Sequence, residues 1–147
     1  MQNRAARIVT RTKKREHIQP VLKSLHWLPV SKRIIYKIAC HAFNYIHKTA
    51  PQYLQSLVKI HRPTRTLRSS GSISLEKNIP KSKFSERSFS FSAPLIWNTL
   101  STKTRNSSSL NTFKKHLKTE LFSSAYESLN WKTLLWSLEI VKKFVLF

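Results

Sequence analysis

The sequence predicts a small, mainly α-helical domain with a short strand-and-loop section. Apolar residues recur every three or four positions along residues 32–48 and again along residues 110–122, which is the period of amphipathic helices. Hydrophobic residues make up 40% of the 147 residues, enough for a partial core. Residues 61–83 contain two prolines and show no helical period, which predicts a loop between two helical parts.

Residues 1–60 are expected to form a basic helical segment. A first helix is predicted over residues 3–15, and Pro20 suits the first turn of a second helix that stops before Pro29. Ser31 is a suitable N-cap for the clearest helix, and Pro51 opens a short one. The apolar positions expected to face the core are Ala5, Ile8, Val9, Val21, Leu22, Leu25, Trp27, Ile34, Ile35, Ile38, Ala42, Tyr45, Ile46, Tyr53, Leu54, Leu57 and Val58.

Residues 61–122 are expected to complete the same domain. The loop should contain a short extended piece around Ile73 and Leu75. Phe89 and Phe91 alternate with serines, which is the period of a strand, and a helical turn follows. Residues 123–147 are interpreted as a divergent tail. The last helix should bury the stripe formed by Leu110, Phe113, Leu117 and Leu121.

The composition argues against an enzyme. There are 27 Lys and Arg against 6 acidic residues, all of them Glu, and the formal net charge is +21 at pH 7. Hard divalent cations need several converging carboxylates, and glycine-rich phosphate loops need more than the single glycine present. One cysteine excludes an internal disulfide and any zinc site built on two thiolates. We therefore expect a basic binding protein without a cofactor or metal.

RNA or DNA is the expected partner, because phosphates neutralise Lys and Arg and release counterions. An anionic membrane surface is the alternative partner. Stable membrane insertion is not expected, since no apolar run approaches the ~18 residues of a span. The first residues lack a secretory apolar run, and the cluster from Lys13 to Arg15 is compatible with nuclear import. A nuclear location or a cytoplasmic ribonucleoprotein is predicted, and secretion is not.

Three groups of cations are the candidate contacts with nucleic acid. The loop cations recur every third residue, which in an extended segment can follow a phosphate backbone, although a solvated flexible loop has the same composition. Trp27 and Trp97 can stack on bases, but their Leu and Pro neighbours favour core packing with a bonded indole N–H. The candidate cations are Arg4, Arg7, Arg11, Lys13, Lys14 and Arg15, then Arg62, Arg65 and Arg68, and finally Lys114, Lys115 and Lys118.

Several short blocks occur in a distinctive order along the chain. They are QNRAARIV at 2–9, LHWLPV at 25–30, APQYL at 50–54, WNTL at 97–100 and FKKHLKTELF at 113–122. This ordered series resembles the region just after the polymerase palm in LINE-type (non-LTR) retrotransposon reverse transcriptases of the jockey and chicken-repeat groups. The resemblance covers residues 2–122, and its most specific block is LHWLPV.

The resemblance implies a fragment that corresponds to the thumb and C-terminal extension. In this family that region holds template RNA and the primer duplex during target-primed reverse transcription. The palm with its paired Asp and the endonuclease domain have no counterpart here, so the fragment would be non-catalytic, its first helix would be truncated, and the palm would be a further partner in the parent protein. Ser85 and Glu86 stand where relatives often have Gly, and residues 123–147 lie outside the resemblance. The alternative is a ribonucleoprotein interaction subunit, or an expressed retroelement remnant without function.

Overall fold

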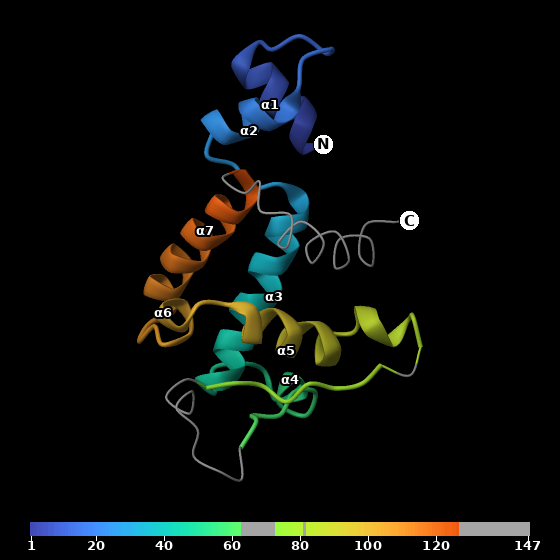
Figure 1. The fold of residues 1–147 in the computed structure, drawn as a ribbon, viewed down its shortest axis with the longest axis vertical. Helices are drawn as coiled ribbons and strands as arrows, with labels where there is room; N and C mark the ends of the chain where they lie inside the picture. The colour runs from blue at the N-terminus through green and yellow to red at the C-terminus, as the bar shows by residue number, and fades with distance from the viewer. Residues whose placement is uncertain (63–72, 81, 127–147) are drawn as a thin grey trace.

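The computed structural model describes residues 1–62, 73–80 and 82–126, and most of them are helical, which confirms the mainly α fold. Figure 1 shows α1 and α2 as a hairpin at one end, from which α3 runs toward α4 at the other. The helices are α1 (Gln2–Thr10), α2 (Ile18–Ser24), α3 (Val30–Ile46), α4 (Gln52–Gln55), α5 (Phe89–Thr99), α6 (Thr102–Arg105) and α7 (Leu110–Tyr126), with the 3-10 turn η2 at Ser85–Arg87.

The central element is α3, which α5 crosses and α7 flanks (Figure 1). Its buried stripe is Ile35, Ala39, Ala42 and Phe43, spaced as one face of a helix. The two alanines are fully buried, and their small side chains let the neighbouring helices approach closely. The helix begins at Val30, one residue before the predicted Ser31 cap, with Pro29 at the N-cap position. Of the face predicted for this helix, Ile35 and Ala42 are buried, whereas Ile34, Ile38, Tyr45 and Ile46 are only half-buried.

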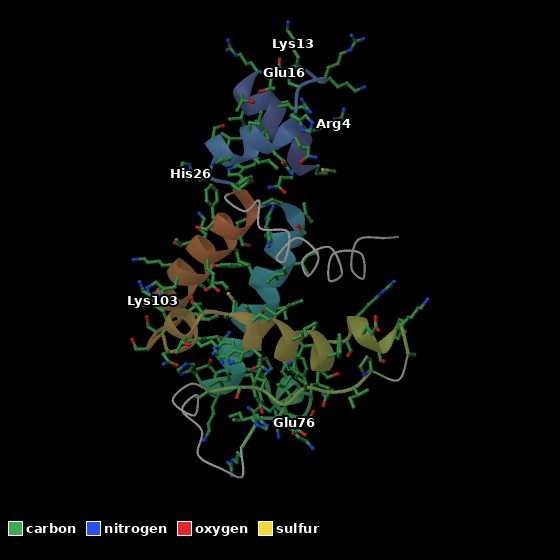
Figure 2. The ribbon with its side chains drawn as sticks, in the orientation of Figure 1. Arg4, Lys13, Glu16, His26, Glu76 and Lys103 are labelled. Carbon is green, nitrogen blue, oxygen red and sulfur yellow. The ribbon has the colours of Figure 1, made fainter. Side chains whose placement is uncertain are left out.

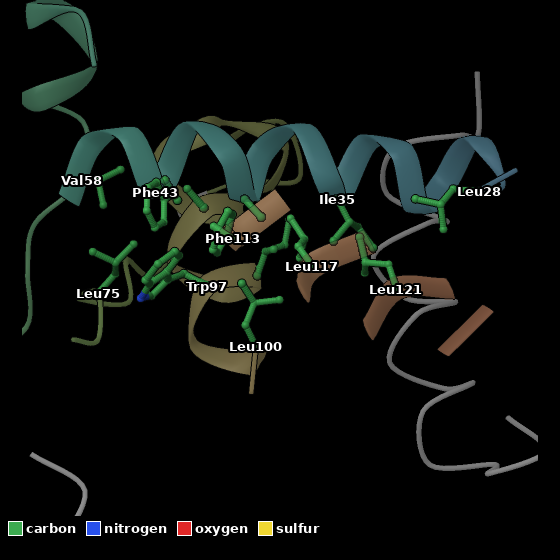
Figure 3. Packing of buried hydrophobic residues seen from close by; sticks show 14 residues of the cluster. Leu28, Ile35, Phe43, Val58, Leu75, Trp97, Leu100, Phe113, Leu117 and Leu121 are labelled. Atoms are coloured by element: carbon green, nitrogen blue, oxygen red, sulfur yellow. The ribbon is translucent and has the colours of Figure 1, made fainter. Parts of the chain in front are cut away.

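Aromatic side chains join α3, α5 and α7 in the core (Figure 3). The ring of Phe113 lies 4.5 Å from that of Phe43 and 5.7 Å from that of Trp97, both in stacked geometry. Trp97 is fully buried, and its indole N–H donates to the carbonyl of Ile73 at 2.9 Å. The prediction that Trp97 packs in the core with a bonded N–H is confirmed.

The predicted extended piece is a single antiparallel bridge between Ile60 and Leu75. The side chain of Asn98 on α5 pairs with the backbone of Leu75, as a neighbouring strand would. Its side-chain oxygen accepts from the Leu75 N–H at 2.9 Å, and its amide group donates to the Leu75 carbonyl at 2.8 Å. Leu75 can therefore be buried without leaving its backbone groups unpaired.

The prediction of a strand at Phe89 and Phe91 is wrong, because both residues lie in the first turn of α5. A proline inside a helix leaves the carbonyl four residues earlier without its N–H donor. Here Pro94 cannot donate to the Ser90 carbonyl, and the side-chain amide of Asn78 donates to that carbonyl at 3.0 Å. This substitute donor lets the helix begin well before Pro94, and no local sequence pattern indicates it.

The hairpin of α1 and α2 also differs from the prediction. The first helix stops at Thr10 instead of residue 15, because Arg11 takes a left-handed conformation with φ 54°. Ala6 and Leu22 are the buried residues of the hairpin. Ile8 and Val9, predicted to point inward, are 77% and 63% exposed. Ala6 and Leu22, and not Ile8 and Val9, therefore form the buried contact of this hairpin.

The last helix is longer than predicted, since α7 continues to Tyr126. Phe113, Leu117 and Leu121 are buried as expected, and Leu110 is half-buried against the core. The first four residues of the predicted tail therefore belong to α7, and residues 127–147 lie outside the described residues.

Three helices end in Schellman motifs whose left-handed residue is not glycine. The left-handed residues are Arg11, His26 and Lys48, with φ of 54°, 54° and 57°. After α3, for example, the Lys48 N–H donates to the Tyr45 carbonyl at 3.1 Å and the Thr49 N–H to the Asn44 carbonyl at 2.9 Å. Glycine is the usual residue at this position.

We expect Lys48→Gly to stabilise the protein by about 0.5–1 kcal/mol. The change removes a steric cost of about 1–2 kcal/mol for a left-handed Cβ, offset by up to about 1 kcal/mol of extra chain entropy. Lys48→Ala is the matched control, because it removes the same exposed side chain but keeps the Cβ. Urea unfolding followed by circular dichroism measures both free energies, and a glycine variant no more stable than the alanine variant would contradict the prediction.

Candidate nucleic-acid interface

The predicted cations that the structure describes are spread along the long axis of the molecule and do not converge on one site. Figure 2 shows Lys13 at one end and Glu76 at the other. Arg62 lies near the Glu76 end, because Ile60 and Leu75 pair there. It is exposed, while Arg65 and Arg68 lie outside the described residues. The cations of α7 lie between these ends (Figure 1).

Residues 11–17, which we term the distal loop, connect α1 to α2 and project from the end of the hairpin (Figure 2). Arg11, Lys13, Lys14 and Arg15 are all exposed on this loop, and Arg4 is exposed on α1. Glu16 is the only acidic residue in the first 17. With four exposed cations on five consecutive residues, this is the densest run of Lys and Arg in the described part of the sequence.

Arg7 on α1 fixes the conformation of the distal loop through two hydrogen bonds. Its guanidinium donates to the carbonyl of Lys13 and, at 2.7 Å, to the carbonyl of Glu16. A single planar group therefore fixes two carbonyls of the loop, three residues apart. Arg7 is half-buried, and its guanidinium positions the loop that carries the exposed cations. That Arg7 itself contacts nucleic acid stays a prediction.

On α7 the three predicted lysines have different surroundings. Lys115 and Lys118 are exposed, whereas Lys114 is half-buried between α7 and α3. Burial raises the pKa of the Cys40 thiol, and the charge of Lys114 together with a hydrogen bond from Tyr36 acts in the opposite direction. Lys114 therefore places its charge near Cys40 on α3, which leaves two exposed cations on this helix.

The carboxylate of Glu120 on α7 accepts three hydrogen bonds from the start of α6. It accepts hydrogen bonds from the Ser101 backbone N–H at 2.9 Å, the Ser101 hydroxyl at 2.9 Å and the Thr104 hydroxyl at 2.7 Å. Ser101 is the N-cap of α6, and its hydroxyl accepts from the Thr104 N–H. Glu120 thus fastens the start of α6 to α7.

A cleft of about 550 Å³ lies where the hairpin meets α3 and α7. Trp27 lines it and is half-buried, so the prediction of core packing holds for Trp97 and is wrong for Trp27. Arg33 and Tyr36 of α3 also line it, and neither was among the residues predicted from the sequence to bind. Their spacing of three residues places them on one helix face, which is the signal that could have found them. The other lining residues are Gln2, Ala5, His26, Leu28 and Lys118.

In the described part of the chain, no three His, Cys or Glu side chains gather as they would around a metal ion. No helix within residues 1–62, 73–80 and 82–126 is long and apolar enough to cross a membrane.

Comparison of the chain with protein-family models gave no match, and neither did the comparisons with curated proteins and with solved structures.

Proposed function

We propose that this chain is a non-catalytic nucleic-acid-binding fragment of a LINE-type retrotransposon reverse transcriptase, which holds template RNA or the primer duplex. The distal loop carries the proposal: Arg11, Lys13, Lys14 and Arg15 are exposed together at a projecting end, on a loop that Arg7 holds in place. Exposed Lys and Arg on a loop of fixed conformation can contact the phosphates of a strand. Contacts to phosphates do not distinguish one base sequence from another. Binding should therefore be tolerant of sequence.

The ordered blocks from QNRAARIV to FKKHLKTELF support the family part of the proposal, and the net charge of +21 supports the polyanionic partner. The first block forms α1, whose exposed Ile8 and Val9 offer an apolar surface. We place the contact with the polymerase palm of the parent protein on this surface.

Neutralising the distal loop tests the binding proposal. We expect the triple variant Lys13→Gln, Lys14→Gln and Arg15→Gln to weaken binding to every RNA and DNA sequence to a similar degree. The slope of log affinity against log salt should become shallower by about one for each phosphate that the loop no longer neutralises, so by up to about three. Fluorescence anisotropy with labelled oligonucleotides at several salt concentrations measures both quantities.

The matched control changes three exposed lysines outside the hairpin to glutamine, at positions 59, 77 and 83. It removes the same charge, so a loss confined to the loop variant identifies the distal loop as the binding surface. Equal losses in both variants would overturn the role of the loop. A wild-type chain that binds neither RNA nor DNA at low salt would overturn the proposed function and favour an interaction subunit or a remnant.

A further inference from the structure

The cleft at the base of the hairpin is built from parts of the chain that are far apart in sequence. Gln2 comes from α1, His26 and Trp27 from the connection between α2 and α3, Arg33 and Tyr36 from α3, and Lys118 from α7. Its volume of about 550 Å³ lies within the ~300–1,000 Å³ range of pockets that take small molecules. In Figure 2 His26 marks the junction where the hairpin meets α7.

The segment that carries Trp27 is held rigidly. The backbone N–H groups of His26 and Trp27 donate to the carbonyls of Lys23 and Leu22, at 3.0 and 2.9 Å, and close the Schellman motif of α2. The ring of His26 stacks on Phe122 of α7, with centroids 5.6 Å apart and planes 11° apart. These contacts fix the wall of the cleft before any ligand arrives, which lowers the entropy cost of binding.

Two carbonyls of the same segment are tied to neighbouring helices. The Tyr126 hydroxyl on α7 donates to the Trp27 carbonyl, and the side-chain amide of Gln2 on α1 donates to the Leu28 carbonyl at 2.8 Å. The Gln2 side-chain oxygen has no hydrogen-bond partner among the described residues. This oxygen is itself buried, so it is the amide nitrogen of Gln2 that ties α1 to the segment of Trp27.

The chemistry of the lining selects the ligand. Trp27 and Tyr36 are half-buried and offer aromatic surface, while Arg33 and Lys118 are exposed and cationic. The described residues that line the cleft include no carboxylate. A flat group with apolar faces and an attached negative charge fits both halves of this lining, and an unpaired nucleotide is such a group.

We infer that the cleft takes one unpaired nucleotide of a bound RNA or DNA strand, with its base against Trp27 and Tyr36 and its phosphate at Arg33 and Lys118. This inference rests on the proposed function and adds to it a site that distinguishes single strands from duplexes. A paired base is stacked inside the helix and cannot enter the cleft, whereas the distal loop meets only phosphates and accepts either form.

The test compares binding of a single-stranded RNA dodecamer with binding of the matching duplex by the full chain. Trp27→Ala is expected to lower single-strand affinity about 5- to 140-fold, the effect of removing one stacked base, and to leave duplex affinity unchanged. Trp27→Phe keeps an aromatic face and should retain most of the single-strand affinity. Tyr53→Ala is the matched control, because Tyr53 is an exposed aromatic residue on α4, away from the cleft.

A second measurement uses the wild-type chain, so its result does not depend on whether a variant folds. Photo-crosslinking of 4-thiouridine RNA to the wild-type chain, followed by mass spectrometry, should label the peptides that contain Trp27 or Tyr36. Adenosine monophosphate alone should bind far more weakly than the strand, because it lacks the neighbouring phosphates that reach the distal loop. Binding of this nucleotide as tightly as the strand would show that the cleft takes a free nucleotide and would overturn the strand assignment.

The outcomes separate the two proposals. The wild-type chain can bind strands with the expected salt dependence and still crosslink only at the distal loop. If, in addition, the Trp27→Ala variant keeps the wild-type preference for single strands, the cleft proposal fails and the proposed function stands. If the wild-type chain binds no nucleic acid, both fail together. Equal losses for strand and duplex in Trp27→Ala, with an unchanged circular dichroism spectrum, would also overturn the cleft assignment.

Discussion

Replacing Phe113 with alanine should cost about 3–5 kcal/mol of the free energy of unfolding, as expected for truncation of a fully buried aromatic side chain. Phe113 is 0% exposed, and its ring stacks against Phe43 of α3 and Trp97 of α5. It is therefore the side chain through which α7 is fastened to both of the other core helices. Small domains have about 5–15 kcal/mol of stability in total, and we expect self-repulsion from the net charge of +21 to place this one toward the lower end. We expect the variant to be largely unfolded in the absence of a ligand.

Urea unfolding followed by circular dichroism measures this loss. Tyr53→Ala is the control, because Tyr53 is 69% exposed and surface substitutions usually change stability by less than about 0.5 kcal/mol. A loss below about 1 kcal/mol for Phe113→Ala would contradict the described core. Added RNA should raise the thermal midpoint of the control variant, since a ligand that binds only the folded state stabilises it.

The affinity for nucleic acid should fall roughly a thousandfold between about 50 and 200 mM salt if about six phosphates are neutralised. Six exposed cations are available at the distal loop and the cleft: Arg11, Lys13, Lys14, Arg15, Arg33 and Lys118. Each neutralised phosphate releases condensed counterions, and this release loses its driving force as bulk salt rises. The fall should be similar for unrelated sequences, because phosphates carry no sequence information.

Binding isotherms at five salt concentrations, with the chloride replaced by acetate in a parallel series, measure the slope. A slope near zero would remove the electrostatic explanation of binding. Wild type and the variant that neutralises the distal loop should converge at high salt, because the contacts that separate them are the screened ones.

The candidate interface followed from the sequence only in part. Charge alone predicted which residue types would meet a polyanion, and the cluster from Arg11 to Arg15 is exposed as that prediction requires. Arg7 and Lys114 belong to the same composition, yet one guanidinium is bonded to loop carbonyls and the other cation is half-buried near Cys40. The sequence does not show whether a basic side chain is free for a ligand or is held by contacts within its own chain.

Helix periodicity was sufficient to predict that α3 and α7 are helices, because both carry apolar residues at the helical spacing. On α3 it predicted the buried face only in part, since Ala39 and Phe43 are buried where Ile34 and Ile38 were expected. The start of α5 was decided by the tertiary structure. Asn78, distant in sequence, supplies the donor that Pro94 cannot, so residues with the period of a strand form a helical turn. The cleft depends in the same way on α1, α3 and α7 meeting at one point, where the segment of Trp27 is held by Gln2 and Tyr126 across most of the chain. The local sequence pattern therefore determines helices that are stabilised along their own length, such as α3 and α7. The start of α5 and the cleft depend on contacts between residues that are distant in sequence, so the sequence pattern does not show them.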